Sequence, residues 1–178
     1  MQKKLELSLS LVIDWLKFAE GKNATLIAAN GAAIFGVLSF LGINFPSNIM
    51  YVTYIYQALL FLFLSATFCL ISFVPQVYVP WLASKKIPHE KDNLLAYADI
   101  ASYDPELYLE TMYKQEAVDL KEIGPFEKNL SELIVLYSRI AMRKYSLFNL
   151  GVWCLLSAIV TPIIALGIYF IRRSYIKE

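Results

Sequence analysis

The chain has 178 residues, of which 58% are hydrophobic and 17% are charged, and its formal net charge at pH 7 is +1. This composition is more apolar than that of an average soluble domain and indicates a membrane protein. The balance of charge argues against a nucleic-acid-binding protein, which needs a basic surface to replace the phosphate counterions. With two cysteines in apolar runs and one histidine, the sequence predicts neither a disulfide framework nor a metal site.

An amphipathic helix is the first predicted element, over residues 1–22. Leu5, Leu9, Val12 and Leu16 recur at helical spacing, with charged residues between them. Such a helix either lies on the inner leaflet or docks on another part of the chain. Because its charged face is mixed in sign, we expect docking on the middle region.

A transmembrane hairpin is predicted over residues 23–75. No charged residue or histidine occurs in the 62 residues from Asn23 to Ser84, and about 20 apolar helical residues cross a bilayer. The run therefore suits two crossings, joined by turn-forming residues between Gly42 and Asn48. A second uncharged stretch, from Tyr145 to Ile171, predicts a third crossing over residues 145–171, followed by a basic tail, 172–178.

Small residues follow one face of the first span. They recur every four residues, a pattern that lets helices approach closely in lipid, and are Ala24, Ala28, Ala32 and Gly36. Asn23 and Asn30 lie seven residues apart on a neighbouring face. We interpret all six as transmembrane packing residues. The asparagines have two open interpretations: hydrogen bonding within or between subunits, or a polar lining that is exposed when a pore opens.

Residues 76–144 predict a helical unit between the second and third spans. The expected helices cover about Lys91 to Ala101, Asp104 to Glu122, and Phe126 onward into the third span. The second opens with Asp104 as N-cap and Pro105 at the first helical position. Since no alternating strand pattern is present, the predicted fold class is all-α, an integral membrane protein with three transmembrane helices.

Lysine and arginine counts predict the orientation. With the N-terminus in the cytoplasm, 13 basic residues lie inside and 3 lie outside, whereas the inverse places only those 3 inside. The N-terminus and the middle region are therefore expected in the cytoplasm.

Basic residues gather where the middle region meets the predicted spans. This basic collar consists of Lys85, Lys86 and Lys91 on entry, Arg139, Arg143 and Lys144 on exit, and Lys17 and Lys22 from the N-terminal helix. Attraction to anionic lipid explains such a collar. The alternative is a site for the phosphate of a small nucleotide, formed by Lys22, Lys85, Lys86, Arg139, Arg143 and Lys144.

The sequence contains few features that are typical of enzymes. The sequence contains no glycine-rich phosphate loop and no nucleophile elbow, and His89 is the only histidine. Asp104 and Glu106 are explained as residues that begin a helix. We therefore predict no catalytic residues, no metal and no cofactor.

Several motifs, in order, resemble those of the transmembrane effectors of Pycsar antiphage defence, the PycTM family. They are WLKFAEGKNA at 15–24, the pair Asn30 and Gly31, KDNLLAYADIA at 91–101, ELYL at 106–109 and SRIAMRKY at 138–145. The resemblance covers roughly residues 12–170.

The resemblance implies a bacterial inner-membrane protein, triggered by cyclic CMP or cyclic UMP from a partner nucleotide cyclase, that impairs the membrane and stops growth of the infected cell. A homo-oligomer that rearranges or forms a pore is the expected effector, with the lipid bilayer as a further partner and no nucleic acid. These 178 residues contain no separate nucleotide-binding β-roll, so the place where the ligand binds is open. If it binds this chain, the middle helices and the basic collar are the region with charge complementary to a phosphate; if it does not, a partner protein senses it. The alternative function is a constitutive membrane scaffold or a transporter or channel subunit, although three spans without an internal repeat argue against a complete transporter.

Overall fold

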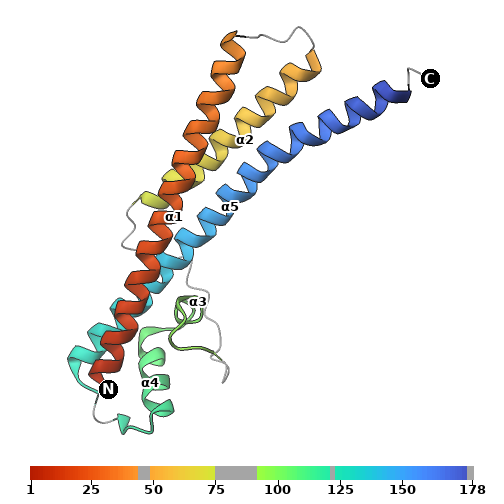
Figure 1. Ribbon diagram of the computed structural model, residues 1–178. Helices are drawn as coiled ribbons and strands as arrows, with labels where there is room; N and C mark the ends of the chain where they lie inside the picture. Colours follow the sequence, from red (N-terminus) through yellow and green to blue (C-terminus); the bar gives the residue numbers. More distant parts are fainter. Residues whose placement is uncertain (44–48, 75–91, 121–122, 176–178) are drawn as a thin grey trace. The chain divides into compact units, whose positions relative to one another are not determined.

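The computed structural model describes residues 1–43, 49–74, 92–120 and 123–175. Five helices form the described part: α1 (Gln2–Ile43), α2 (Ile49–Phe73), α3 (Tyr97–Ile100), α4 (Pro105–Gln115) and α5 (Pro125–Tyr175) (Figure 1). No strand occurs in these four ranges, which confirms the predicted all-α fold class.

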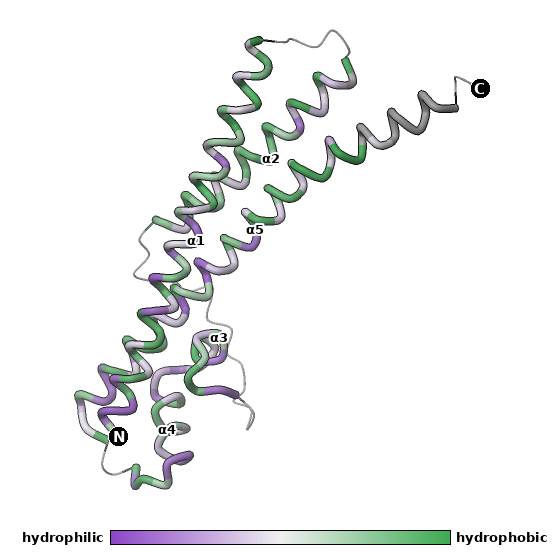
Figure 2. Tube along the Cα trace, viewed as in Figure 1, coloured by the Kyte–Doolittle hydropathy of each residue, from purple (hydrophilic) through white to green (hydrophobic). Residues whose placement is uncertain are grey.

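Three of the helices are long and apolar enough to cross a bilayer. These candidate spans lie in α1, α2 and the part of α5 up to Ile164. Hydrophobic residues dominate α2 and the C-terminal half of α1, whereas hydrophobic and hydrophilic residues alternate in α4 and the first turns of α5 (Figure 2). The chain is therefore a membrane protein with three transmembrane helices.

The amphipathic segment and the first span are one uninterrupted helix, α1, of 42 residues. No proline interrupts the segment, and Gly21 lies inside the helix without ending it. Single glycines in a helix weaken it without breaking it.

The chain divides into two compact units. We call residues 1–21 with 74–146 the helical unit, and residues 22–73 with 147–178 the membrane unit. Both α1 and α5 pass from one unit into the other without a break in the helix.

The helical unit has its own hydrophobic core. Its buried side chains come from α1, α3, α4, α5 and the segments between them, and are Leu5, Val12, Leu94, Ile100, Tyr103, Tyr108, Leu109, Met112, Tyr113, Leu130, Ile134 and Val135. Leu5 and Val12 have no exposed surface. The expected docking of the N-terminal amphipathic segment on the middle region is thus confirmed.

The helix expected from Lys91 to Ala101 was wrong in extent, since α3 covers only Tyr97–Ile100. Asn93 explains the difference. Its Oδ1 accepts a hydrogen bond from the backbone N–H of Leu95 at 3.0 Å, and its own N–H donates to Asp99 Oδ2 at 3.1 Å. An Asx turn of this kind offers the backbone an alternative to helical hydrogen bonds.

The helix expected from Asp104 to Glu122 begins as predicted, with Asp104 Oδ1 accepting from the N–H of Glu106 at 3.3 Å. It ends earlier, at Gln115. Ala117 has a φ of 52°, and the N–H of Val118 donates to the carbonyl of Tyr113 at 3.1 Å. This is a Schellman motif with alanine where glycine is usual, so the sequence gives no sign of it.

Helix α5 begins at Pro125 and runs for 51 residues. Gly124 donates its N–H to Glu127 Oε2 at 2.6 Å, the side-chain half of a capping box, and proline is favoured at the first helical position. The predicted continuation into the third span is confirmed. Pro162 lies inside the helix, which continues beyond it to Tyr175.

Candidate functional site

Arg139 fastens α5 to the segment between α3 and α4 in the helical unit. Its Nε donates to the carbonyl of Ala101 at 3.1 Å, and one terminal nitrogen donates to the carbonyl of Tyr103 at 2.8 Å. Ala101 and Tyr103 are both 2% exposed. These carbonyls follow a helix of four residues, so a charged donor satisfies acceptors that would otherwise be poorly paired.

The other predicted phosphate-binding residues differ in the groups that their side chains contact. Lys144 pairs with Glu20 at 2.8 Å, and Lys22, in the membrane unit, lies 5.6 Å from the centre of the Phe148 ring. Arg143 is half-buried, and its side chain makes no hydrogen bond or ion pair within the described ranges. Lys85 and Lys86 lie outside the described residues.

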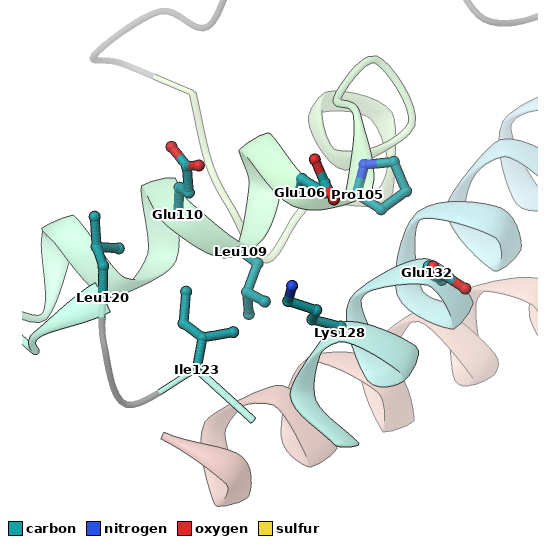
Figure 3. A pocket seen from close by; sticks show the side chains of 8 residues that line it. All are labelled: Pro105, Glu106, Leu109, Glu110, Leu120, Ile123, Lys128 and Glu132. Atoms are coloured by element: carbon teal, nitrogen blue, oxygen red, sulfur yellow. The ribbon is translucent and has the colours of Figure 1, made fainter. Parts of the chain in front are cut away.

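A groove of about 310 Å³ lies between α4 and the first turns of α5 (Figure 3). Its floor is apolar, with Leu109 and Ile123 pointing toward each other, while Lys128 reaches in from α5. Three carboxylates also line it, from Glu106, Glu110 and Glu132. One lysine and three carboxylates give the lining of the groove a net negative charge, which repels a phosphate. This groove therefore does not have the chemistry predicted for the nucleotide site.

An aromatic stack lies near the end of the helical unit where α1 and α5 leave it. The rings of Tyr97 and Tyr145 stack with centres 5.0 Å apart, and Trp15 lies 5.6 Å from Tyr97. Tyr145 Oη also donates to the carbonyl of Trp15 at 3.4 Å. Trp15 is 43% exposed. Tryptophan and tyrosine are typical of membrane–water interfaces, so this stack is suited to the level of the headgroups.

The pKa of Tyr103 predicts that the helical unit loses stability at high pH. Burial, the hydrogen bond from its hydroxyl to Asp92 at 3.2 Å, and the charges of Asp92 and Asp99 raise the pKa of Tyr103 to about 12. The unfolded chain releases this proton near pH 10, its ordinary value, so the folded state holds the proton more tightly.

We therefore expect the contribution of Tyr103 to stability to be complete below pH 10 and to be lost as the pH rises from about 10 to 12. Unfolding of the helical unit, followed by tyrosine absorbance and circular dichroism across this range, measures the loss. A Tyr103→Phe variant should lose less stability over the same interval. Identical pH dependence in the two proteins would contradict the assignment.

A buried hydrogen-bonded junction joins the three helices of the membrane unit. Asn30 Nδ2 in α1 donates to Ser65 Oγ in α2 at 2.8 Å, and Ser65 Oγ donates to the carbonyl of Gly151 in α5 at 2.7 Å. Asn30 and Ser65 have no exposed surface. Polar side chains that hydrogen-bond across helices stabilise their association in lipid.

Gly151 lies where α5 packs tightly against α1 and α2. A Cβ placed there would lie 3.1 Å from Cys69 Sγ, 3.1 Å from Leu26 Cδ2 and 3.3 Å from the carbonyl oxygen of Ser65. Only glycine fits without displacing a neighbour. Sequence reasoning missed both Gly151 and Ser65, although a glycine within a long apolar run is typical of close helix packing.

The predicted packing residues of the first span divide between two faces of α1. Asn23 and Asn30 are fully buried in the membrane unit. The four small residues lie on the exposed face instead: Ala24, Ala28, Ala32 and Gly36. A Cβ added at Gly36 would meet no atom within 4 Å. The small-residue face thus packs against no other helix in the described part of the chain.

No group of three or more histidine, cysteine, aspartate or glutamate side chains that could hold a metal ion occurs among the described residues.

Comparison with protein families identifies a Pycsar effector protein domain that matches residues 4–171. No curated protein and no solved structure matches the chain.

Proposed function

The chain belongs to the Pycsar effector family and is an antiphage membrane effector, and from this we propose that a cyclic mononucleotide triggers it to permeabilise the bacterial inner membrane. The observation that carries the proposal is the junction of a folded helical unit to three apolar helices through the continuous helices α1 and α5. The chain acts by rearranging its helices and not by catalysis.

The proposed orientation places the helical unit in the cytoplasm. The loop between the first two spans carries no lysine or arginine, whereas the segments around the helical unit carry most of the basic residues. A nucleotide made by a cyclase in the cytoplasm then reaches the helical unit directly. That cyclase is the proposed functional partner.

Arg143 is the member of the predicted phosphate site best suited to a ligand. Its guanidinium makes no ion pair within the described ranges, and arginine binds phosphate oxygens in a bidentate manner. Arg139 already binds two backbone carbonyls and Lys144 binds a carboxylate, and a nucleotide would have to displace these groups. We retain Lys22, Lys85 and Lys86 as proposed supporting cations.

A ligand shifts a conformational equilibrium only if it binds the two conformations unequally. Helix α5 offers a physical route for such a shift. Arg139 attaches the segment between α3 and α4 to α5, and Arg143 lies one turn further along the same helix. Ligand binding at Arg143 therefore acts on a helix that is also the third span.

Co-expression with the partner cyclase tests the proposed function in cells. Membrane depolarisation, measured with a voltage-sensitive dye, should require both the cyclase and this chain. A catalytically dead cyclase is the control. Full membrane potential in cells that make the cyclic nucleotide and hold the effector in the membrane would refute the proposal.

We further propose that the effector is a homo-oligomer in which the small-residue face of α1 meets a second copy. The face is exposed in the single chain, and small residues permit close helix approach where lipid offers no hydrophobic drive between helices.

Replacing Ala28 with phenylalanine should therefore weaken the oligomer, because the ring prevents close approach of the helices. Chemical crosslinking in membranes should show less oligomer for Ala28→Phe than for wild type. Leu38→Phe, at an exposed position outside the small-residue face, is the matched control and should crosslink normally. Equal crosslinking of the Ala28 variant and wild type would place the contact elsewhere.

A further inference from the structure

A polar seam runs along the interior of the membrane unit. Asn23 and Asn30 in α1, and Ser65 and Ser72 in α2, are each at most 2% exposed. Both pairs are spaced by seven residues, and α1 and α2 run antiparallel (Figure 1). Because Asn30 contacts Ser65, the same register brings Asn23 and Ser72 to one level, about 10.5 Å further along at 1.5 Å per residue.

The seam is incompletely satisfied. Asn30 Oδ1 and Ser72 Oγ are buried and accept or donate no hydrogen bond within the described residues. Buried polar groups are almost always paired, and unpaired ones are costly in an apolar surrounding. These atoms are therefore positioned to bind water, which the lipid-facing surface of the same helices cannot do.

Two consecutive hydrogen bonds hold the three helices together at the seam. Ser65 receives the hydrogen bond from Asn30 and passes its own to the carbonyl of Gly151, so a single hydroxyl ties all three helices together. Losing the Ser65 hydroxyl would release α5 from α2 and leave the amide of Asn30 without its described partner.

We propose that this seam, and not the outer face of α1, is the path that fills with water when the effector opens. The inference rests on the proposed function, in which the membrane becomes permeable. The residues proposed to line the path are Asn23, Asn30, Ser65 and Ser72, and the hydrogen bonds of the Ser65 hydroxyl hold it closed. The transported species are small hydrated ions, which amide and hydroxyl groups can partly solvate.

Cys69 supplies a native probe of the seam. It lies on α2 between Ser65 and Ser72 at helical spacing, has no exposed surface, and its Sγ is 3.1 Å from the Cβ position of Gly151. Thiols react with charged methanethiosulfonates as thiolates, so modification requires water at the sulfur. In a Cys154→Ala background Cys69 is the single thiol.

The experiment measures the rate at which an impermeant charged methanethiosulfonate modifies Cys69 in the full-length protein reconstituted in vesicles. Ser65→Ala should raise this rate about fivefold or more without any nucleotide, since interhelical hydrogen bonds are lost. A control with Cys69 and Cys154 replaced by alanine and Ala28→Cys introduced should show no such increase. Circular dichroism confirms that each variant is folded.

Several outcomes decide between the two paths. An unchanged Cys69 rate in folded Ser65→Ala would overturn the proposal, as would a rate increase at Ala28→Cys in place of Cys69. In wild-type vesicles that leak on addition of cyclic CMP or cyclic UMP, unreactive Cys69 would also overturn it. Absence of any leak would instead count against the proposed trigger, and the Ser65→Ala comparison would still decide the path.

Discussion

Replacing Gly151 with leucine should separate the three helices of the membrane unit and destabilise it by about 1–3 kcal/mol, the range for overpacked interiors. Even the first added carbon would lie 3.1 Å from Cys69 Sγ and 3.3 Å from a backbone oxygen of α2. The backbone oxygen cannot move without shifting its helix. The Ser65 hydroxyl would also lose its acceptor on α5.

Denaturation by SDS in mild detergent measures this effect, with the fluorescence of Trp153 on α5 as the signal in a background where Trp15 and Trp81 are replaced by phenylalanine. Gly167→Leu, on the same helix, is the matched control, because a Cβ at Gly167 meets no atom within 4 Å. Its denaturation midpoint should stay close to that of wild type. Equal midpoints for Gly151→Leu and wild type would show that α5 does not approach α1 and α2 at this residue.

Replacing Arg139 with glutamate should have the largest effect on the helical unit. The change removes two charged hydrogen bonds and brings a carboxylate toward the carbonyl oxygens of Ala101 and Tyr103. Hydrogen bonds to charged groups contribute about 1.5–3 kcal/mol each, so a loss of about 3 kcal/mol or more is expected. Urea denaturation followed by circular dichroism measures it, and toxicity in cells with the cyclase should disappear.

Arg143→Glu separates the stability of the unit from ligand recognition. The side chain of Arg143 makes no hydrogen bond or ion pair within the described residues, so its replacement should leave the free energy of unfolding nearly unchanged. If Arg143 binds the phosphate, toxicity is nevertheless lost. A folded Arg143→Glu variant that still depolarises cells would remove Arg143 from the proposed site.

Much of the fold could be predicted because the strongest signals are local. Long uncharged runs determine the three apolar helices, and Asp104 with Pro105 determines where α4 begins. The end of α4 could not be predicted, because Ala117 adopts a left-handed conformation that the sequence does not announce. The short α3 likewise depends on the Asn93 turn, in which a side chain competes with helical hydrogen bonds.

The candidate sites were less predictable because their contacts join residues far apart in the sequence. Charge counting placed Arg139 in a phosphate-binding collar, but its guanidinium binds two backbone carbonyls. The spacing of small residues identified the small-residue face of α1, but the sequence of one helix does not reveal which of its faces the neighbouring helices cover. The junction of Asn30, Ser65 and Gly151 spans three helices, and its partners emerge only from their packing.

The central claim is that a nucleotide signal received by the helical unit opens the membrane unit. The most direct test uses the purified full-length protein in vesicles that hold a potassium diffusion potential, with a voltage-sensitive dye as the readout. Addition of cyclic CMP or cyclic UMP should collapse the potential with wild type and leave it intact with Arg143→Glu. A potential that survives both nucleotides in vesicles containing folded, correctly oriented protein would contradict the account.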